Sequence, residues 1–319
     1  MNEISIKEMK GLSIGHAQIE KAKTGVTVIY FPDGAKVGCD ISGGGPASRE
    51  TPLTSPLTAD NPVNAIVLSG GSAYGLAASD GVMRRLEEEG IGYDTGYALV
   101  PLVCQSCIFD LNYGSARRRP DADTGYAACD IALEECDDRM GSVGAGTGAT
   151  VGKLLGMRQA QKSGVGIHAV QVGDLQIAAI VVVNAFGDIF KDGKKIAGLM
   201  DHNRKDFLDS SQVMLDIFSK PRDMFTGNTT IGCIVTNGKF SKAEMNKIAA
   251  MTRNAYARCI NPVGTMADGD TIYACSVGEV MADINLVGTI SAKVMEEAIV
   301  KAIESSRMDD DEFLANCRG

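Results

Sequence analysis

The sequence predicts a protein of the α/β (α+β) class, in which antiparallel sheets are covered by helices. Three observations favour this class. Short β-branched runs recur between turn-forming residues, several connections are short enough for hairpins, and helical patterns separate the groups of strands. With 319 residues, of which 45% are hydrophobic and 22% charged, the chain has enough apolar material for a sizeable core.

The N-terminal residues 12–45 are predicted to form antiparallel strands. Residues 25–31 are a β-branched run, Pro32-Asp33-Gly34 is a turn signal, and residues 35–41 return as a second strand. Three glycines at 43–45 then end the strand pattern. They permit a close approach to a ligand or to another backbone, or else form a flexible loop.

A glycine-rich turn joins the next strand to a helix. The strand at 65–68 ends at Ser69-Gly70-Gly71-Ser72, and an amphipathic pattern predicts a helix over 73–89. The turn lacks the Gly-Lys-Ser/Thr ending of a phosphate loop and the spacing of a dinucleotide fingerprint, so it does not predict nucleotide binding. A strand at 106–111 and a helix at 123–136 follow.

A small-residue segment, 141–150, precedes Lys153, which is either a solvated surface group or a buried partner for a carboxylate or carbonyl. Residues 164–186 are predicted to form a hairpin that ends at Asn184. Residues 187–227 have little periodicity, and the part before Thr229 is predicted to be a mobile linker. The remaining predicted elements are a strand from Thr229, a helix from the Ser241 capping box to about Arg258, a strand at 271–276 and a helix at 290–307.

Charge and composition argue against several classes of partner. The net charge is -9 and the only basic run is Arg117-Arg118-Arg119, so we expect no nucleic-acid partner. The N-terminus lacks the pattern of a secretory signal, and the longest apolar run, 177–183, is far shorter than a membrane span. We therefore expect a soluble, cytoplasmic protein without a membrane partner.

Cysteine usage suggests neither a metal site nor a redox site. The nine cysteines are scattered, as expected for reduced and mostly buried thiols. Cys104 and Cys107 form one Cys-x-x-Cys pair, but no second pair completes a zinc set. No metal or organic cofactor is predicted.

The sharpest chemical signal is Thr229. It follows Gly227-Asn228 and heads an apolar β-branched run, so a loop is expected to enter a buried strand at this hydroxyl. For an isolated Asn-Thr-Thr the ordinary interpretation is the start of a strand. However, Asp268 and Asp270 flank a glycine before another strand, and Asn184 ends an apolar strand upstream. A hydroxyl, paired carboxylates and an amide are the parts of an acyl-transfer site, although Asp-Gly-Asp alone also suits a β-turn.

A threonine nucleophile needs a base, because its hydroxyl is a poor nucleophile. The three histidines, His16, His168 and His202, lie outside these motifs, which disfavours a Ser-His-Asp type triad. If the Asn228–Thr229 peptide bond is cut, Thr229 gains an α-amine with a pKa of about 7.7 to 8.0, which can accept the hydroxyl proton near neutral pH.

The combined motifs resemble the L-aminopeptidase/D-esterase family (P1 or S58 peptidases), which includes β-aminopeptidases and nylon-oligomer hydrolases. The resemblance covers nearly the whole chain, and the order and spacing of the motifs make it specific. The motifs are Gly43-Gly44-Gly45-Pro46, residues 68–76, residues 144–153, Asn184-Ala185-Phe186-Gly187, Asn228-Thr229-Thr230 and Asp268-Gly269-Asp270.

The resemblance implies a four-layer αββα sandwich of the N-terminal-nucleophile type, as in aminopeptidases and ornithine acetyltransferases. It also implies a single domain, residues 1–319, which cuts itself between Asn228 and Thr229 into chains 1–228 and 229–319. Thr229 would be the nucleophile, and Asp268 and Asp270 would orient it. Asn184 would stabilise the oxyanion, and Lys153 would belong to the same site.

The substrate is expected to be a small amide or peptide, such as a peptide, an amino-acid amide, a β-peptide or a short polyamide. The residues expected to contact it are Gly71, Ser72, Tyr74 and Phe109. Phe109 departs from the family, where several relatives carry a tyrosine. Either Tyr74, Tyr113 or a backbone N–H takes the role of that tyrosine, or the oxyanion hole is weaker. Alternatives are an acyltransferase of the ornithine acetyltransferase type and an unprocessed, non-enzymatic relative. The resemblance also implies a homo-oligomer, a tetramer or larger.

Overall fold

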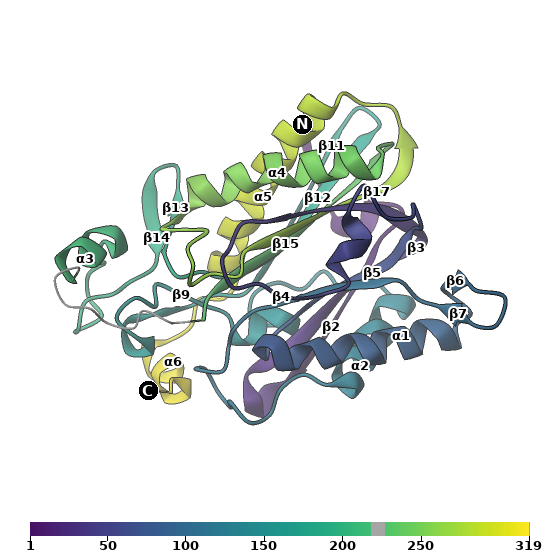
Figure 1. The fold of residues 1–319 in the computed structure, drawn as a ribbon. Helices are drawn as coiled ribbons and strands as arrows, with labels where there is room; N and C mark the ends of the chain where they lie inside the picture. Colours follow the sequence, from purple (N-terminus) through teal and green to yellow (C-terminus); the bar gives the residue numbers. More distant parts are fainter. Residues whose placement is uncertain (218–226, 319) are drawn as a thin grey trace.

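In the computed structural model, which describes residues 1–217 and 227–318, helices cover both outer faces of two packed sheets (Figure 1). A 10-stranded hydrogen-bonded network runs in the order β1-β11-β12-β15-β17-β3-β5-β8-β4, with β2 beside β3. The bounds of these strands are β1 Asn2–Ile4, β2 Ser13–Ile19, β3 Thr24–Ile41, β4 Ala47–Arg49, β5 Val63–Ser69, β8 Val103–Cys107, β11 Val165–Val172, β12 Leu175–Asn184, β15 Thr229–Gly238 and β17 Thr271–Val280.

Strand β3 belongs to both layers. Its first half pairs with β2 and β5, and its second half, from Lys36 to Ile41, pairs with β17. The predicted turn at Pro32-Asp33-Gly34 is therefore wrong: the chain continues instead of reversing, because the two halves find different partners. The turn residues instead accommodate a shift of register against β5 between Tyr30 and Ala35, and Gly34 takes a φ of 72° there.

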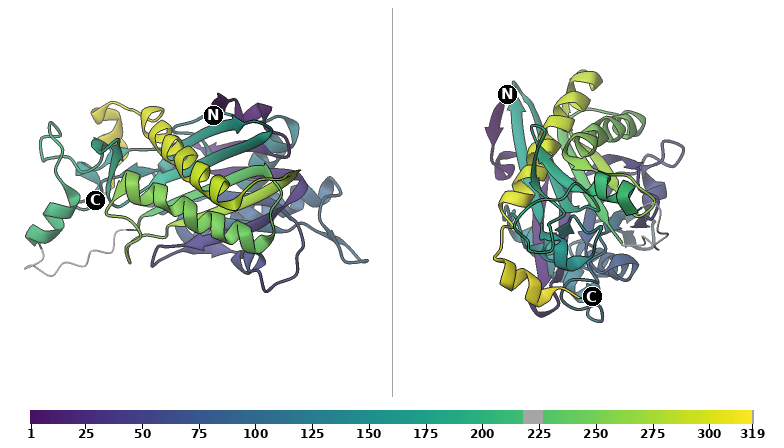
Figure 2. Two further views of the ribbon diagram at one scale, coloured as in Figure 1. Left: turned by 90° about the horizontal axis from the view of Figure 1, so that it is seen from above. Right: turned by 90° about the vertical axis from the view of Figure 1, so that its left-hand side faces the viewer.

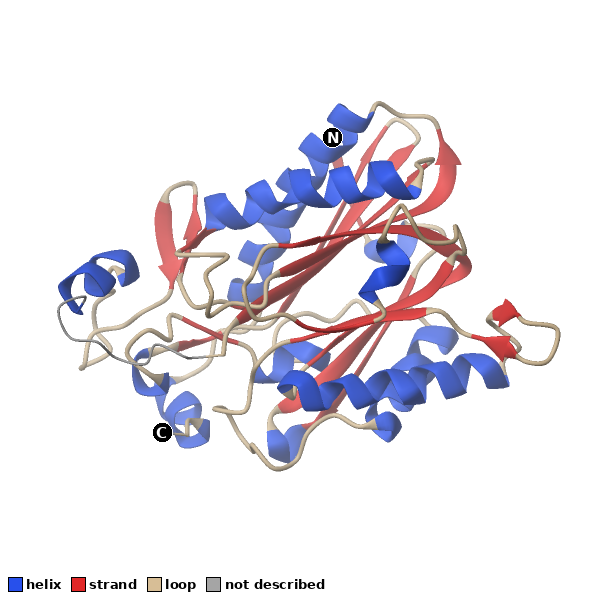
Figure 3. Cartoon of the chain, in the orientation of Figure 1, coloured by secondary structure: helices blue, strands red, loops and turns tan. Residues whose placement is uncertain are grey.

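Three hydrophobic cores separate the four layers. Along β12, Ala178, Ile180 and Val182 face the second sheet, whereas Ile177 and Val181 face the covering helices. This is the period of two expected for a strand buried on both faces. The third core lies between the β2-β3-β5-β8 layer and its own helices. The predicted αββα sandwich is confirmed, and Figures 2 and 3 show the strands enclosed by helices.

The helices begin and end close to the predicted positions. On one outer face lie α1, Ala78–Glu88, and α2, Ala122–Glu134, and on the other lie α4, Lys242–Cys259, and α5, Ile284–Glu304. The Ser241 capping box is present. Helix α5 begins earlier than predicted because the side chain of Asp283 accepts hydrogen bonds from two backbone N–H groups of the first turn. No helix of the described residues is long and apolar enough to cross a membrane.

Not all neighbouring strands are antiparallel. The pairs β15–β17 and β5–β8 are parallel, because a helical crossover, through α4 and through α1 respectively, separates each pair along the chain. The shorter elements are β6 Tyr93–Asp94, β7 Leu99–Val100, β9 Thr150–Val151, β10 Gln161–Lys162, β13 Asp188–Lys191, β14 Lys194–Ala197, β16 Ile260–Asn261, α3 Ser210–Ile217 and α6 Asp310–Asn316.

Residues 187–217 are more ordered than the sequence suggests, because they contain β13, β14 and α3. The predicted linker before Thr229 falls largely on residues 218–226, outside the described residues. Asp188 organises the segment. Its buried carboxylate contacts Lys195 Nζ at 2.7 Å and accepts hydrogen bonds from the N–H of Leu199 and from the N–H and hydroxyl of Ser210.

Replacing this carboxylate is expected to destabilise the fold. An Asp188→Ala substitution leaves Lys195 without its ion-pair partner and three other donors without their acceptor, so the free energy of unfolding should fall by about 3 kcal/mol, measured by urea denaturation. The matched control is Glu304→Ala. It removes an exposed ion pair in which Glu304 Oε1 lies 3.5 Å from Lys191 Nζ. The control should change stability by about 0.5 kcal/mol or less. Equal effects of the two substitutions would contradict the role assigned to Asp188.

Candidate active site

The ends of strands β12, β15 and β17 meet at the same end of the sheet layer that they form together. Strands β12 and β15 are antiparallel, with Asn184 opposite Thr229, so the end of one lies beside the start of the other. Strands β15 and β17 are parallel, with Ile231 opposite Thr271, so their starting residues are neighbours. This topology brings Asn184, Thr229 and the Asp268-Gly269-Asp270 segment together, as the sequence predicts.

The Asp268-Gly269-Asp270 segment lies against the Asn228–Thr229 peptide bond. Asn228 and Asp268 form a parallel β-bridge, and the Gly269 N–H donates a hydrogen bond of 2.9 Å to the carbonyl oxygen of Asn228. The Thr229 hydroxyl donates to the same carbonyl oxygen. The carbonyl oxygen of the bond predicted to be cut therefore accepts hydrogen bonds from a side-chain hydroxyl and from a backbone N–H.

Both carboxylates are held by further donors. Asp270 accepts hydrogen bonds from the N–H groups of Thr230, at 2.6 Å, and Gly264, at 3.0 Å. Asp268 accepts from the N–H of Thr265, at 3.0 Å, and from its hydroxyl, at 2.6 Å. Each side chain is 1% exposed. The pair is therefore fixed inside the protein and is not a solvent-exposed turn.

The glycines at 43–45 support this segment. The Gly45 N–H donates to the Asp268 carbonyl at 2.8 Å, and the Gly43 N–H donates to the Asp270 carbonyl at 3.2 Å. A Cβ atom on Gly43 would lie 2.3 Å from the backbone nitrogen of Asp270. Of the two predicted reasons for these glycines, close approach to another backbone is the one observed.

Lys153 and Asn184 form the other wall of the site. The Lys153 ammonium donates to the backbone and side-chain oxygens of Asn184, at 2.9 and 2.8 Å. The Asn184 Nδ2 in turn donates to the carbonyl of Phe109, at 2.9 Å. Lys153 is 1% exposed, so of its two predicted environments the buried one is confirmed. In this arrangement both oxygens of Asn184 hold Lys153, whereas the Gly269 N–H donates to the Asn228 carbonyl.

Burial dominates the titration of this cluster. It lowers the pKa of Lys153 to about 7, although the charges of Asp268, Asp110 and Asp270 act in the opposite direction. Burial and the charge of Asp268 raise the pKa of Asp270 to about 7. Burial also raises the pKa of Asp268. Lys153 and Asp270 can therefore exchange protons near neutral pH, as acid–base catalysis requires.

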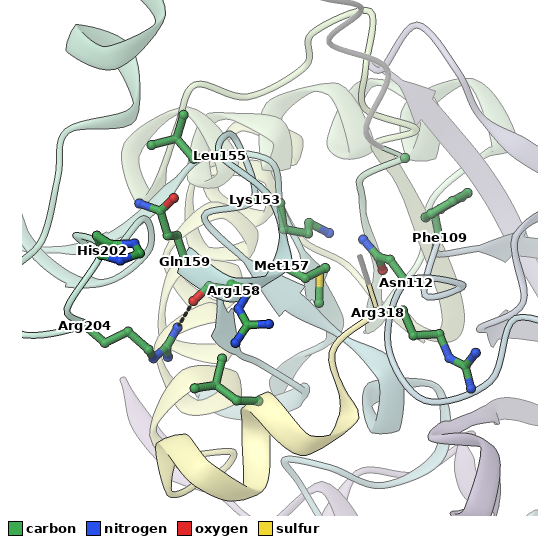
Figure 4. A pocket seen from close by; sticks show the side chains of 13 residues that line it. Phe109, Asn112, Lys153, Leu155, Met157, Arg158, Gln159, His202, Arg204 and Arg318 are labelled. Atoms are coloured by element: carbon green, nitrogen blue, oxygen red, sulfur yellow. Dashed lines mark hydrogen bonds between the residues drawn. The ribbon is translucent and has the colours of Figure 1, made fainter.

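A cavity of about 680 Å³ opens beside Lys153, Phe109 and Gly227 (Figure 4). Its size suits a small-molecule or peptide substrate. A Cβ atom on Gly227 would lie 2.2 Å from the Phe109 ring, so the two residues pack closely. The other residues that line the cavity are Asn112, Leu155, Gly156, Met157, Arg158, Gln159, His202, Arg204, Leu314 and Arg318.

The other predicted substrate contacts lie apart from this lining. Gly71 takes a φ of 86°, and its N–H donates to the Asp110 carboxylate. Ser72 follows it with a φ of 54°. Tyr74 is 61% exposed and lies under the guanidinium of Arg119, 3.8 Å from the ring centroid. Of the four predicted contacts, only Phe109 lines the cavity beside Lys153.

Both tyrosines considered as substitutes for the family tyrosine have other partners in the structure. Tyr113 is buried and its hydroxyl donates to the sulfur of Met308. Tyr74 points to solvent and stacks on Arg119. The Asn228 carbonyl accepts hydrogen bonds from the Gly269 N–H and from the Thr229 hydroxyl.

Asp110 is a buried site residue to which the sequence assigns no role. Its carboxylate accepts hydrogen bonds from the Thr24 hydroxyl, at 2.6 Å, and from the Gly71 N–H, at 2.7 Å. Burial raises its pKa to about 6. In the sequence, its position directly after an apolar run only weakly indicates a functional role, and its partner Thr24 is distant along the chain. Because the carbonyl of the neighbouring Phe109 accepts from Asn184, Asp110 anchors the backbone behind the site.

The Cys-x-x-Cys pair contributes no reactive thiolate. Cys104 and Cys107 are both buried in β8. Burial raises the pKa of each thiol to about 12, so both are protonated at neutral pH.

Comparison with known proteins identifies the family. The model of peptidase family S58 matches residues 4–310. The chain belongs to peptidase family S58. The resemblance seen in the sequence is thus confirmed, and family S58 membership makes the chain a hydrolase of amide bonds.

Two relatives illustrate the range of the S58 family. An uncharacterized aminopeptidase of Mycobacterium tuberculosis is 35% identical, over 96% of this chain and 90% of its own. A protein of Agromyces named 6-aminohexanoate-oligomer endohydrolase is 32% identical, over 92% of this chain and 84% of its own.

Solved structures share the S58 fold. The L-aminopeptidase D-Ala-esterase/amidase of Ochrobactrum anthropi, described as a variant of the Ntn hydrolase fold, matches with a TM-score of 0.69 at 16% identity, over 98% of this chain and 92% of its own. A Burkholderia β-aminopeptidase matches with a TM-score of 0.66 at 17% identity, over 98% and 92%.

Proposed function

We propose that this chain is a self-processing N-terminal-nucleophile hydrolase that uses Thr229 to cleave amide bonds of peptides, amino-acid amides or short polyamides. The observation that carries the proposal is the environment of the Asn228 carbonyl. Its oxygen accepts hydrogen bonds from the Thr229 hydroxyl and the Gly269 N–H. A nucleophile, its target carbonyl and an oxyanion donor are thus in contact before any cleavage.

Self-cleavage would begin when Thr229 Oγ1 forms a bond with the carbonyl carbon of Asn228. The hydroxyl proton passes to a neighbouring group, for which Asp270 and Lys153 both titrate near pH 7. Negative charge develops on the Asn228 oxygen, where the Gly269 N–H stabilises it. The carbon–nitrogen bond then breaks as the nitrogen of Thr229 takes up a proton, and water hydrolyses the resulting ester.

The same residues would then act on substrates. Chain 1–228 ends in a carboxylate, and Thr229 carries a free α-amine that can accept the proton of its own hydroxyl. The substrate carbonyl occupies the place of Asn228 and forms an ester with Thr229. An amine leaves and water regenerates the enzyme. Lys153 and the two carboxylates set the charge around the new amine.

The proposal is tested by an intact mass spectrum of the purified protein together with an assay of amino-acid p-nitroanilides. We expect two chains, residues 1–228 and 229–319, and release of p-nitroaniline. An uncut chain that hydrolyses these amides would refute the requirement for processing. An uncut chain without activity would refute the proposed function under the conditions of the test.

A methyl group on Gly269 is expected to slow self-cleavage. The Cβ atom of a Gly269→Ala variant would lie 2.9 Å from Thr229 Oγ1 and 2.8 Å from the Gly45 carbonyl oxygen. Displacement of the hydroxyl or of the segment should slow cleavage about 100-fold, measured by gel electrophoresis of newly synthesised protein. Gly45→Ala is the matched control, because its nearest contacts would be 3.7 and 3.9 Å away. Comparable slowing of both variants would argue against a specific effect at Thr229.

We also propose that the protein is a cytoplasmic homo-oligomer, a tetramer or larger, as the resemblance to the family implies. Light scattering coupled to size-exclusion chromatography gives the mass of the assembly. Cell fractionation gives its compartment. A monomer at micromolar concentration would contradict the proposed assembly.

A further inference from the structure

The cavity beside Lys153 is lined by basic side chains from separate parts of the chain. Lys153 follows β9, Arg158 lies in the 3-10 helix Met157–Gln159, and Arg318 follows α6. Arg204 and His202 complete the set, and Figure 4 shows these side chains around the cavity. Among the described residues that line it, none is Asp or Glu.

Two of these arginines form no ion pair with a carboxylate of the described residues. Arg204 is already engaged: it contacts Asp310 at 2.7 Å and donates to the carbonyls of Arg158 and Ala160. Arg158 and Arg318, in contrast, form no ion pair with any described residue. The Nε of Arg318 donates to the Gly114 carbonyl, which fixes its position and leaves its terminal nitrogens available. Both side chains are solvent-exposed, so a ligand can reach them.

The cavity approaches the reacting bond from its acyl side. Gly227, which lines it, is separated by one residue from Thr229. In self-cleavage Asn228 supplies the acyl carbon, so Gly227 marks the direction in which the acyl group extends. A substrate whose carbonyl replaces that of Asn228 would extend its acyl part into the same space.

We infer that this cavity binds a carboxylate on the acyl part of the substrate, held by Arg158 and Arg318, and that the enzyme prefers amides of acidic acyl groups. The inference rests on the proposed function of Thr229. Guanidinium groups bind carboxylates through paired, charge-assisted hydrogen bonds. The same charges repel an ammonium group, so a free amino end of the substrate has to lie outside this cavity, toward Asp268 and Asp270.

Binding of a probe without an amide bond tests the cavity independently of catalysis. In calorimetric titrations glutarate should bind the purified protein roughly tenfold or more tightly than pentane-1,5-diol, which has the same chain length and no charge. Raising the salt concentration from about 0.1 M to about 1 M should weaken glutarate binding, because it shortens the screening length from about 10 Å to about 3 Å. Equal affinity for the two probes would overturn the inference.

Arginine variants locate the binding site. Arg158→Gln and Arg318→Gln should each weaken glutarate binding by roughly tenfold, because each removes a charged donor. Lys247→Gln removes one positive charge from an exposed position on α4 and is the matched control. A loss of affinity as large in the control as in the arginine variants would show a non-specific charge effect and overturn the assigned site.

A kinetic comparison tests whether the carboxylate-binding cavity receives the acyl part of the substrate. The ratio of kcat/KM for L-glutamic acid α-(p-nitroanilide) to that for L-glutamine p-nitroanilide should exceed about 10 and fall toward 1 in the Arg158→Gln, Arg318→Gln double variant. A ratio near 1 in the parent enzyme that binds glutarate would overturn the placement of the acyl group. Hydrolysis of neither substrate would count against the proposed nucleophile, while the glutarate titration would still decide whether the cavity binds carboxylates.

Discussion

The Thr229→Ala protein is expected to remain a single chain of 319 residues and to hydrolyse amides about four orders of magnitude more slowly than the parent. Alanine removes the Oγ1 atom that contacts the Asn228 carbonyl and leaves the Gly269 hydrogen bond in place. Without cleavage, no α-amine forms at residue 229. One substitution therefore removes the nucleophile and prevents formation of its base. Intact mass spectra and p-nitroanilide assays of the same preparation measure both effects.

A Thr229→Ser variant separates loss of the hydroxyl from loss of structure. Serine keeps Oγ and removes only a methyl group from a side chain that is 4% exposed. It should therefore still cleave, although at a reduced rate because its side chain is less restricted. If Thr229→Ala splits at the same bond as the parent, another residue or a contaminating protease performs the cleavage. If the alanine variant stays uncut but hydrolyses amides at the parental rate, Thr229 serves processing only.

The sequence predicts the site better than it predicts the geometry that creates it. Thr229, Asp268, Asp270 and Asn184 are each recognisable at the ends of apolar strands. Their convergence depends on β12 pairing with β15 across 44 intervening residues, as follows from their bounds, Leu175–Asn184 and Thr229–Gly238. Local patterns do not specify which distant strands become neighbours. The resemblance to a known family supplied that information, because motif order reflects the shared topology.

Features that depend on contacts distant in sequence escaped prediction. Pro32-Asp33-Gly34 has the residue types of a turn, yet the strand continues because its second half pairs with β17. Thr24 and Asp110 hydrogen-bond across 86 positions of the chain. The cavity beside Lys153 likewise combines basic side chains that are unremarkable in the sequence, such as Arg158 and Arg318. Tertiary packing decides each of these cases, whereas propensity and periodicity describe only the local chain.

The Lys153→Met protein is expected to cleave itself about 100-fold more slowly at pH 7, with its pH dependence displaced to higher pH. The positive charge of Lys153 lowers the pKa values of Asp268 and Asp270, opposing the effect of burial. Its removal weakens the opposition to burial, so both carboxyl groups hold their protons to higher pH. In the parent, the cleavage rate should rise as the pH passes through about 7, because an ionised Asp270 accepts the Thr229 proton. In the variant that rise should move upward by about 1 to 3 pH units.

The shift of the pH profile distinguishes an electrostatic role of Lys153 from a purely structural one. Loss of its hydrogen bonds to Asn184 could by itself slow cleavage, but it would lower the rate by the same factor at every pH. Cleavage is followed on newly synthesised chains transferred to buffers between about pH 5 and pH 10. These conditions match the uncut state in which the carboxyl groups and Lys153 face one another. Lys153→Arg keeps the charge and should keep the midpoint near that of the parent, even if its larger side chain lowers the rate. A Lys153→Met profile with an unchanged midpoint would show that the lysine charge does not control the acidic pair.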